Sequence, residues 1–229
     1  MTAVTVVGTG TIGTTVATTL ARGAVPGCTL VAAVNSRTGI EDVLAAIATS
    51  DVVVEASSVQ AACTVIPMAV SSGKDVIVCS CAALAVPSMA VSPAATGRIL
   101  LPPGAIGGLD ILAAAICADG VEARVRHVTV KSPAALGADV GDGGPVEVFR
   151  GTARHAALRF PRTSNSSVAL ALATVGLDRT EVVIVADQAA TSTLHRVQWV
   201  SAVGTYEFSF HNTVDHASGG RHRRSPHGQ

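Results

Sequence analysis

The chain has 229 residues, of which 48% are hydrophobic and 14% charged, and its 16 basic residues balance its 16 acidic ones. This composition excludes a disordered chain, and the net charge of zero excludes the broad positive field by which proteins bind nucleic acids and anionic membranes. No apolar run approaches the roughly 18 residues of a membrane span, and we expect no signal peptide, because no charged segment precedes the first strand-like residues. We therefore expect a cytoplasmic protein with no nucleic-acid and no membrane partner.

Short β-branched runs alternate with longer alanine-rich segments in the first part of the chain. The expected strands are 4–7, 30–34, 52–55 and 76–79, and the expected helices are 14–21, 40–48 and 61–70. Alternation of this kind predicts parallel strands joined by crossover helices, which is the α/β, Rossmann-type doubly wound sheet. We assign residues 1–107 to this first domain.

After Pro102 and Pro103 the pattern changes to that of an α+β domain, which we assign to residues 108–210. The expected helices are 104–117, which opens on a glycine-rich turn, and 168–175; the expected strands are 125–130, 146–149, 182–185, 195–200 and 206–211. Residues 211–229 are rich in His and Arg and poor in apolar side chains, which predicts a disordered tail.

The chain has five cysteines, an odd number, and most of them lie in hydrophobic stretches. This pattern is typical of small buried side chains in a reducing compartment, so we expect no disulfide. Cys79 and Cys81 are separated by one residue rather than by the two of a zinc or redox motif, and no histidine stands at ligand spacing. We therefore expect no metal site.

The first expected strand and helix are joined by the run G-T-G-T-I-G, which begins at Gly8. In a dinucleotide-binding fingerprint, Gly8 permits the tight turn, Gly10 lets the backbone approach a pyrophosphate, and Gly13 lets helix and strand pack closely. The helix amino terminus, at Thr11 and Ile12, adds N–H groups and the positive end of the helix dipole. An ordinary glycine turn is the alternative, but the strand-turn-helix context favours binding of NADP or NAD.

The adenosine ribose of NAD is usually bound by an acidic side chain about 20 residues after the glycines, at the end of the second strand. Here that strand ends at Asn35, Ser36 and Arg37, with no carboxylate. Asn35 and Ser36 can form hydrogen bonds and Arg37 can pair with a 2′-phosphate, although a solvated loop arginine is the alternative. On the first interpretation, NADP is accepted at least as well as NAD.

A second glycine-dense segment, P-P-G-A-I-G-G-L-D, occupies residues 102–110. Three glycines within five positions indicate a backbone held close to another group. That group could be the nicotinamide or a substrate carboxylate that faces a helix amino terminus. The alternative is a hinge between the domains, and the spacing does not decide between the two.

Several short segments stand out when the chain is read as a whole. They are V-E-A-S at 54–57, G-A-I-G-G-L-D at 104–110, F-R-G-T-A-R at 149–154, F-P at 160–161, G-L-D-R-T at 176–180 and V-A-D at 185–187. Taken in this order, they closely resemble the L-aspartate dehydrogenase family, and the resemblance covers residues 1–210. It implies an enzyme that uses NAD or NADP to oxidise L-aspartate to iminoaspartate, or to aminate oxaloacetate reductively with ammonia, in NAD biosynthesis. It also implies a homodimer, with residues 1–107 as the dinucleotide-binding domain and 108–210 as the substrate and dimerisation domain.

The resemblance assigns site residues as well. In that family the histidine after the A-D segment is the catalytic acid/base, and the matching residue here is His195. The matching cofactor contacts are Ala105 in the glycine loop and Asn165 after the F-P pair. The further cofactor-site positions that it implies are Ala56, Ser57 and Ala83. An imidazole, with an ordinary pKa near 6.5, suits proton transfer during hydrolysis of an imine, although a lone histidine is more often a surface or core residue.

Other ionisable residues are given weaker roles. His127 and His155 lie among arginines, so we interpret both as exposed. Asp110 and Asp187 could orient a substrate or His195, but we interpret both as turn or helix caps. Lys131 follows an expected strand and could attract a dicarboxylate, with a solvated lysine as the alternative.

The chain departs from the family pattern at Ala82, where the family usually has glycine, and at Thr193, where it usually has asparagine. After Asn212 the family continues into an alanine- and leucine-rich helix, whereas this chain becomes polar. That change suggests the hypothesis of a frameshifted or truncated end. Two alternatives to an aspartate dehydrogenase therefore stay open: a catalytically impaired NAD(P)-binding paralogue, and a reductase of another small dicarboxylate or imine.

Overall fold

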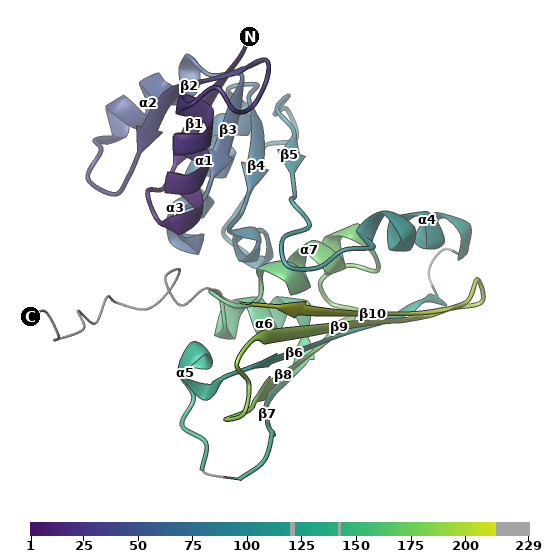
Figure 1. Cartoon of the computed structure of the whole chain (residues 1–229). Coiled ribbons are helices and arrows are strands. Elements are labelled where there is room, and N and C mark those ends of the chain that lie inside the picture. Colours follow the sequence, from purple (N-terminus) through teal and green to yellow (C-terminus); the bar gives the residue numbers. More distant parts are fainter. Residues whose placement is uncertain (120–121, 142, 214–229) are drawn as a thin grey trace, which may run out of the picture.

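Two five-stranded sheets, one in each half of the chain, make up the fold (Figure 1). The computed structural model describes residues 1–119, 122–141 and 143–213. In these parts of the chain, no helix is long and apolar enough to cross a membrane, and no cluster of His, Cys, Asp or Glu side chains is arranged to hold a metal ion.

The first sheet is parallel throughout and has the strand order β2-β1-β3-β4-β5. Its elements are β1 (Thr2–Val7), α1 (Thr11–Ala21), β2 (Cys28–Val34), α2 (Ile40–Ala48), β3 (Val52–Glu55), α3 (Val59–Ser71), β4 (Asp75–Val78), the short 3₁₀ helix η1 (Cys81–Ala85) and β5 (Ile99–Leu100). Because successive strand residues point to opposite faces, Val4 and Val6 pack in the cluster of α1, while Val53 and Val76 pack in the cluster of α2 and α3. Helices on both faces confirm the predicted doubly wound sheet.

The second sheet is mixed and has the strand order β10-β9-β6-β8-β7, in which only β6 and β8 are parallel. Its elements are α4 (Leu109–Asp119), β6 (Arg124–Lys131), α5 (Pro133–Leu136), β7 (Val146–Thr152), α6 (Ala153–Arg159), α7 (Asn165–Ala173), β8 (Thr180–Ala186), β9 (Thr193–Val200) and β10 (Thr205–Asn212). The predicted α+β character of this half is confirmed.

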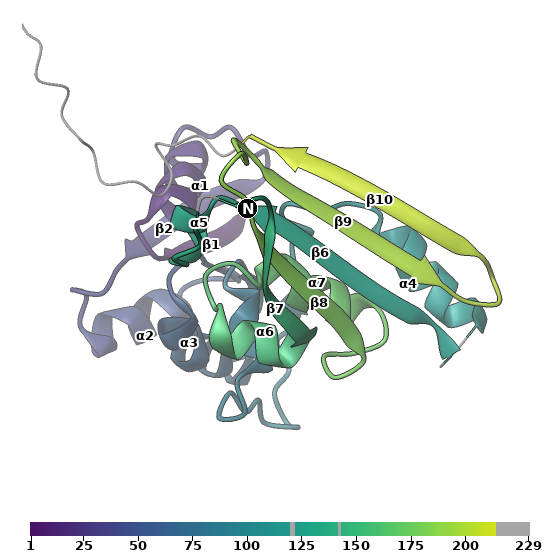
Figure 2. The ribbon, with the colours of Figure 1, turned by 90° about the horizontal axis from the view of Figure 1, so that it is seen from below.

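The second sheet turns one face toward α4, α6 and α7. Burial follows the period of two along its strands, and His127, Val182, Val197 and Trp199 on the helix side are fully buried. Figure 2 shows the other face, where β10, β9, β6 and β8 lie in view with no helix of the described chain across them. We refer to this surface as the outer face.

The two halves of the chain are packed together through η1. Cys81, Ala82 and Ala85 of η1 are buried in one apolar cluster with residues of α6 and α7. The Ala82 N–H also donates to the Asn165 Oδ1 atom at 3.0 Å. These contacts hold the carboxyl ends of β3 and β4 beside the amino terminus of α7, which is where the site described below lies.

Some boundaries differ from the predicted ones. The prediction of a disordered tail from residue 211 is wrong for His211 and Asn212, because both pair with β9 in the last strand; residues 214–229, on which the rest of that prediction falls, lie outside the described residues. The helix predicted over 104–117 begins only at Leu109, because Gly104 and Gly108 have φ values of 64° and 74° that a helix cannot contain. The elements β5, α5, α6 and η1 were not predicted, and each is too short to show a clear hydrophobic period.

Candidate active site

The fingerprint glycines form a tight turn between β1 and α1. Gly8 has φ of 108°, and a β-carbon there would lie 2.2 Å from the Ala56 carbonyl oxygen. A β-carbon at Gly13 would lie 1.9 Å from the Gly8 carbonyl oxygen. By contrast, no described atom lies within 4 Å of the place that a β-carbon of Gly10 would take. Two of the glycines are therefore needed for packing, and the third leaves a space that a ligand could approach.

That space lies at the amino terminus of α1. Gly10 is the residue before the helix and has no side chain to cap it, and the first turn holds no acidic residue. Ile12 in this turn is 58% exposed. Such a terminus suits an anion, because its N–H groups and dipole present positive charge. The residues present thus fit the diphosphate of NAD or NADP.

The end of β2 carries the residues predicted to bind the adenosine ribose. Asn35 Oδ1 accepts a hydrogen bond from the Arg37 backbone N–H at 2.9 Å, and the Asn35 N–H donates to Thr38 Oγ1 at 3.0 Å. These bonds shape a turn from which the side chains of Ser36 and Arg37 extend into solvent. The side-chain oxygen of Asn35 therefore already accepts a hydrogen bond within the turn, whereas the exposed guanidinium of Arg37 can bind a phosphate.

Glu55 is a buried carboxylate at the end of β3 that sequence reasoning did not single out. Its Oε1 accepts from the Ser57 N–H and Ser57 hydroxyl, each at 2.8 Å, and from the Ser80 hydroxyl at 3.0 Å. Its Oε2 accepts from the Ser80 N–H at 2.9 Å. The carboxylate therefore fastens the loop after β3 to the loop after β4. In the sequence, Glu55 stood out only as the acid that ends the apolar run V-V-V-E and as a member of the segment V-E-A-S, and neither pattern assigned it a role.

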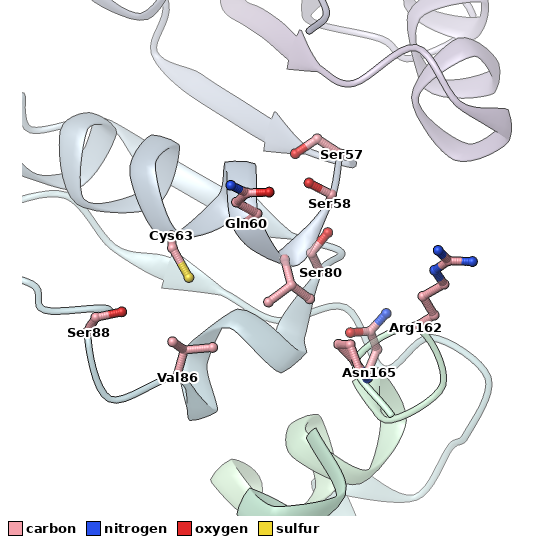
Figure 3. A pocket seen from close by; sticks show the side chains of 11 residues that line it. Ser57, Ser58, Gln60, Cys63, Ser80, Val86, Ser88, Arg162 and Asn165 are labelled. Carbon is pink, nitrogen blue, oxygen red and sulfur yellow. The ribbon is translucent and has the colours of Figure 1, made fainter. Parts of the chain in front are cut away.

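Two cavities adjoin these loops, and they share Arg162 and Asn165. The serine cavity, of about 720 Å³, is lined by Ser57, Ser58, Val59, Gln60, Cys63, Ser80, Val86, Ser88, Pro161, Arg162 and Asn165. Figure 3 shows three of its serines, Ser57, Ser58 and Ser80, on one side and Asn165 and Arg162 on the other. The histidine cavity, of about 400 Å³, is lined by Ile12, Cys79, Cys81, Pro102, Pro103, Gly104, Ala105, Lys131, Arg162, Thr163, Asn165, Ser166, Ala169 and His195.

The histidine cavity brings together four predicted residues from distant parts of the chain. Ile12 comes from the fingerprint, Ala105 from the glycine loop, Asn165 from α7 and His195 from β9. Ser57 lines the serine cavity next to it. The remaining predicted positions do not line either cavity: Gly8, Gly10, Thr11, Gly13, Asn35, Ser36, Arg37, Ala56 and Ala83. Ala83 is fully buried within η1.

The glycine loop at 104–108 is explained mainly by aromatic side chains of β10. A β-carbon at Gly108 would lie 2.9 Å from the Phe208 ring, and one at Gly107 would lie 3.4 Å from the Phe210 ring. The Ala105 carbonyl oxygen accepts a hydrogen bond from Asn212 Nδ2 at 2.8 Å. Two of the three glycines thus pack on protein rather than on a ligand or at a hinge, and the loop wall of the cavity is fixed from the last strand.

His195 lies at the inner wall of the histidine cavity and is 3% exposed. Its Nδ1 is 3.1 Å from His127 Nε2 and 3.2 Å from Thr129 Oγ1, so Nε2 is the ring nitrogen available to a molecule in the cavity. Burial, and then the charge of Lys131, lower the pKa of His195 to about 4. The imidazole is therefore neutral at neutral pH.

Lys131, on the same wall, lies in the cavity rather than in bulk solvent, and burial lowers the pKa of its ammonium group. Of the two interpretations given to this residue, the structure favours the one in which it faces a ligand. Cys79 and Cys81 also line the cavity. Burial, followed by neighbouring negative charge, raises the pKa of both thiols, that of Cys81 to about 12, so both stay protonated.

The interpretation of His127 as exposed was wrong, whereas His155 is exposed as expected. His127 is fully buried because it occupies an inward position of β6, like Val125 and Thr129, which the flanking arginines at outward positions conceal in the sequence. Its Nδ1 lies 2.8 Å from Ser167 Oγ. Asp187 accepts a hydrogen bond from the Ala189 N–H at 2.9 Å, which agrees with its predicted turn-capping role.

The two buried histidines predict that acid destabilises the fold. Burial first, then His195 and Lys131, lower the pKa of His127 to about 3. Because both folded-state pKa values lie below the unfolded value of 6.5, the unfolded state binds more protons as the pH falls below 6.5, and stability is lost on that side. We expect the free energy of unfolding to fall by on the order of 3 kcal/mol between pH 7 and pH 5.

Urea unfolding at several pH values measures how the free energy of unfolding depends on pH. This dependence should be weaker in His127→Gln and unchanged in the matched control His155→Gln, at an exposed position. A midpoint that does not move between pH 7 and pH 5 would contradict the burial of two neutral imidazoles.

Both halves of the chain are similar to known proteins. Residues 110–220 match the family described as aspartate dehydrogenase, C-terminal, and residues 8–92 match the NAD-binding domain of homoserine dehydrogenase. The chain is 36% identical over 181 residues to L-aspartate dehydrogenase 2 of Bordetella pertussis, covering 73% of this chain and 67% of the relative. It is 35% identical over 187 residues to L-aspartate dehydrogenase of Methanopyrus kandleri, covering 78% and 67%. The crystal structure of aspartate dehydrogenase from Thermotoga maritima superposes with a TM-score of 0.69 at 27% identity, covering 92% of this chain and 89% of that one.

Proposed function

Since the chain belongs to the L-aspartate dehydrogenase family, whose members are NAD(P)-dependent oxidoreductases acting on the CH–NH₂ group, we propose that it interconverts L-aspartate and iminoaspartate. Hydrolysis of the imine gives oxaloacetate and ammonia, and the reverse direction is reductive amination. The observation that carries the proposal is the histidine cavity, which is lined by His195 together with Ala105, Asn165 and Ile12 of the fingerprint helix.

A nicotinamide cofactor held by the fingerprint glycines and the cavity residues would supply hydride transfer, while the protein orients the substrate and moves protons. His195 is neutral at neutral pH and offers Nε2 to the cavity, so it can take a proton from the water that adds to the imine carbon. In the reverse direction it returns that proton to the departing oxygen. Lys131 is placed to attract a substrate carboxylate on the same wall.

The proposed cofactor site runs from the fingerprint to the cavities. Gly8, Gly10, Thr11, Ile12 and Gly13 would hold the diphosphate. The loops that would flank the nicotinamide contribute Ala56, Ser57, Ala83, Ala105 and Asn165. The proposed division into a dinucleotide-binding domain (1–107) and a substrate and dimerisation domain (108–210) is supported by the end of the first sheet at Leu100 and the start of the second at Arg124.

We expect Arg37 to favour NADP. The end of β2 offers an exposed guanidinium and no carboxylate, so a 2′-phosphate would gain a charge-assisted hydrogen bond there. Arg37→Ala should raise the Kd of NADPH about tenfold and leave that of NADH within about twofold. Fluorescence titration with both cofactors measures this difference. The matched control is Arg22→Ala, another exposed arginine; equal loss of both cofactors in Arg37→Ala would overturn the assignment.

A homodimer through the outer face is part of the proposal. Between ion pairs such as Arg126–Glu181 and Arg196–Glu207, this face carries the half-buried apolar side chains of β6. Within the described chain, Arg126 Nε is buried and has no hydrogen-bond acceptor, although it lies 3.5 Å from Glu181 Oε2, which is an ion-pair distance. We expect sedimentation equilibrium to give twice the chain mass, and Val128→Asp to give a monomer. A monomeric wild-type chain would exclude this interface.

The proposed cellular role is the supply of iminoaspartate for NAD biosynthesis in the cytoplasm. The direct test of the activity follows NADPH and NADH absorbance with oxaloacetate, with and without ammonia. Consumption that requires ammonia supports the proposal. Consumption with another small dicarboxylate or imine instead would favour the alternative reductase, and tight cofactor binding without any turnover would favour the impaired paralogue.

A further inference from the structure

A buried row of polar side chains leads from α7 to His195. Ser167 Oγ lies 2.8 Å from His127 Nδ1, and His127 Nε2 lies 3.1 Å from His195 Nδ1. The two imidazole rings are nearly parallel, with an interplanar angle of 19° and centroids 5.2 Å apart. Ser167 and His127 are 2% and 0% exposed, so water does not compete for these contacts.

A single hydrogen atom can lie between the two ring nitrogens, which leaves two arrangements. If the hydrogen belongs to His127 Nε2, then His195 Nδ1 is an acceptor and neutral His195 carries its own hydrogen on Nε2. If it belongs to His195 Nδ1, then His195 Nε2 keeps a lone pair and His127 carries its hydrogen on Nδ1. The hydroxyl of Ser167 can accept or donate, so it fits both arrangements.

Proton exchange at Nε2 of His195 requires the second arrangement. As a base, His195 needs a lone pair on Nε2 and so has its hydrogen on Nδ1. After it accepts a proton it carries hydrogens on both nitrogens. In both states the Nδ1–H therefore needs an acceptor, as the histidine of a catalytic triad does. The two candidate acceptors beside Nδ1 are His127 Nε2 at 3.1 Å and Thr129 Oγ1 at 3.2 Å.

We propose that His127 is a positioning residue that accepts the Nδ1–H of His195, is itself held by Ser167, and thereby keeps the Nε2 lone pair of His195 directed to the substrate. This inference rests on the proposed function, in which His195 exchanges the proton. The proton taken from the attacking water forms the Nε2–H bond of His195 and leaves by the same bond. It is not passed on to His127.

The surroundings support an acceptor that stays neutral. Burial, then His195 and Lys131, lower the pKa of His127 to about 3, so it does not compete for the proton. The titratable, charged and hydrogen-bonding groups that contact His195 or line its cavity are His127 and Thr129 from β6, Lys131 at the end of that strand, Arg162, and the thiols of Cys79 and Cys81. Among these described neighbours none is a carboxylate, which distinguishes this row from a histidine oriented by an acid.

The test is the position of the hydrogen on His195, measured by ¹⁵N NMR of histidine-labelled protein at neutral pH. We expect Nδ1 to be protonated and Nε2 unprotonated in the wild type. His127→Gln should preserve this, because its amide oxygen can accept at the same place. His127→Leu removes the proposed acceptor and leaves the Thr129 hydroxyl, which can donate to Nδ1 as well as accept from it, so at least part of the hydrogen should move to Nε2.

Ser167→Ala is a second variant that should fold, because alanine suits the helix interior of α7. It removes the acceptor for the Nδ1–H of His127, so His127 should shift its hydrogen to Nε2 and His195 should again become the Nε2–H form. Wild-type His195 with its hydrogen on Nε2, or an Nδ1–H that persists in both His127→Leu and Ser167→Ala, would overturn the inference.

Steady-state kinetics then distinguish a His127 that positions His195 from a His127 that only stabilises the fold. We expect His127→Leu to lower kcat about 10- to 100-fold with KM for oxaloacetate little changed and the acid limb of the pH profile displaced, whereas His127→Gln should stay within about threefold of the wild type. Absence of turnover in the wild type with every substrate would mean that the proposed function fails. The tautomer measurement requires no turnover, so it judges the hydrogen-bond arrangement separately.

Discussion

Replacing His195 by alanine is expected to lower kcat for ammonia-dependent reduction of oxaloacetate by about 10²- to 10⁴-fold, the range that a positioned general acid/base supplies. The Kd of NADPH should stay within a few fold, because the fingerprint and the loops after β3 and β4 are untouched. Steady-state rates with saturating NADPH, together with a separate binding titration, measure the two quantities.

The matched control for this experiment is His155→Ala. His155 is exposed on α6 and lies in neither cavity, so its loss should leave kcat unchanged. Because His195 is buried, circular dichroism and a thermal melt of both variants show whether the fold is retained. A folded His195→Ala variant with near wild-type kcat would remove His195 from the proton-transfer step.

The second large effect is expected at Gly10. A β-carbon there meets no described atom within 4 Å, and the residue has φ of −74°, which alanine adopts without strain. Gly10→Ala should therefore fold with wild-type stability, yet its methyl group would occupy the space in which a diphosphate approaches the backbone. We expect the Kd of NADPH and of NADH to rise about 10- to 100-fold, the equivalent of one charge-assisted hydrogen bond.

Gly8→Ala provides the contrast. Its β-carbon would lie 2.2 Å from a backbone oxygen at a φ of 108°, so this variant should lose about 2–4 kcal/mol of folding stability whether or not a cofactor is present. Urea unfolding without cofactor and fluorescence titration with it separate the two effects. Unimpaired cofactor binding by Gly10→Ala would place the dinucleotide elsewhere.

The first sheet could be predicted almost completely from the sequence, because its signals are local. Each strand and its following helix differ in period, and the glycines at 8–13 mark the turn between them. Valines on both faces of the strands are typical of a parallel sheet covered twice. Elements of four or five residues, such as η1, carry too few apolar positions for any period to be visible.

The site could be predicted only in part, because its other residues are defined by contacts between distant segments. The resemblance to a family led to His195, Ala105 and Asn165, which the structure places around one cavity. The burial of His127 was not predicted, because it depends on which face of β6 packs against α7. The role of Glu55 was not predicted, because a single acid at a strand end gives no indication that two serines will donate hydrogen bonds to it.

The bond between Asn212 and the Ala105 carbonyl joins positions 107 residues apart, and the rings of Phe208 and Phe210 pack on the same loop. During synthesis the amino-terminal sheet leaves the ribosome long before β10 does, and domains generally fold from the amino terminus. The glycine loop therefore lacks its contacts with Phe208, Phe210 and Asn212 until β10 has paired with β9. A nascent chain can form the fingerprint turn early, but the wall of the histidine cavity that contains Ala105 is completed only when this late strand arrives.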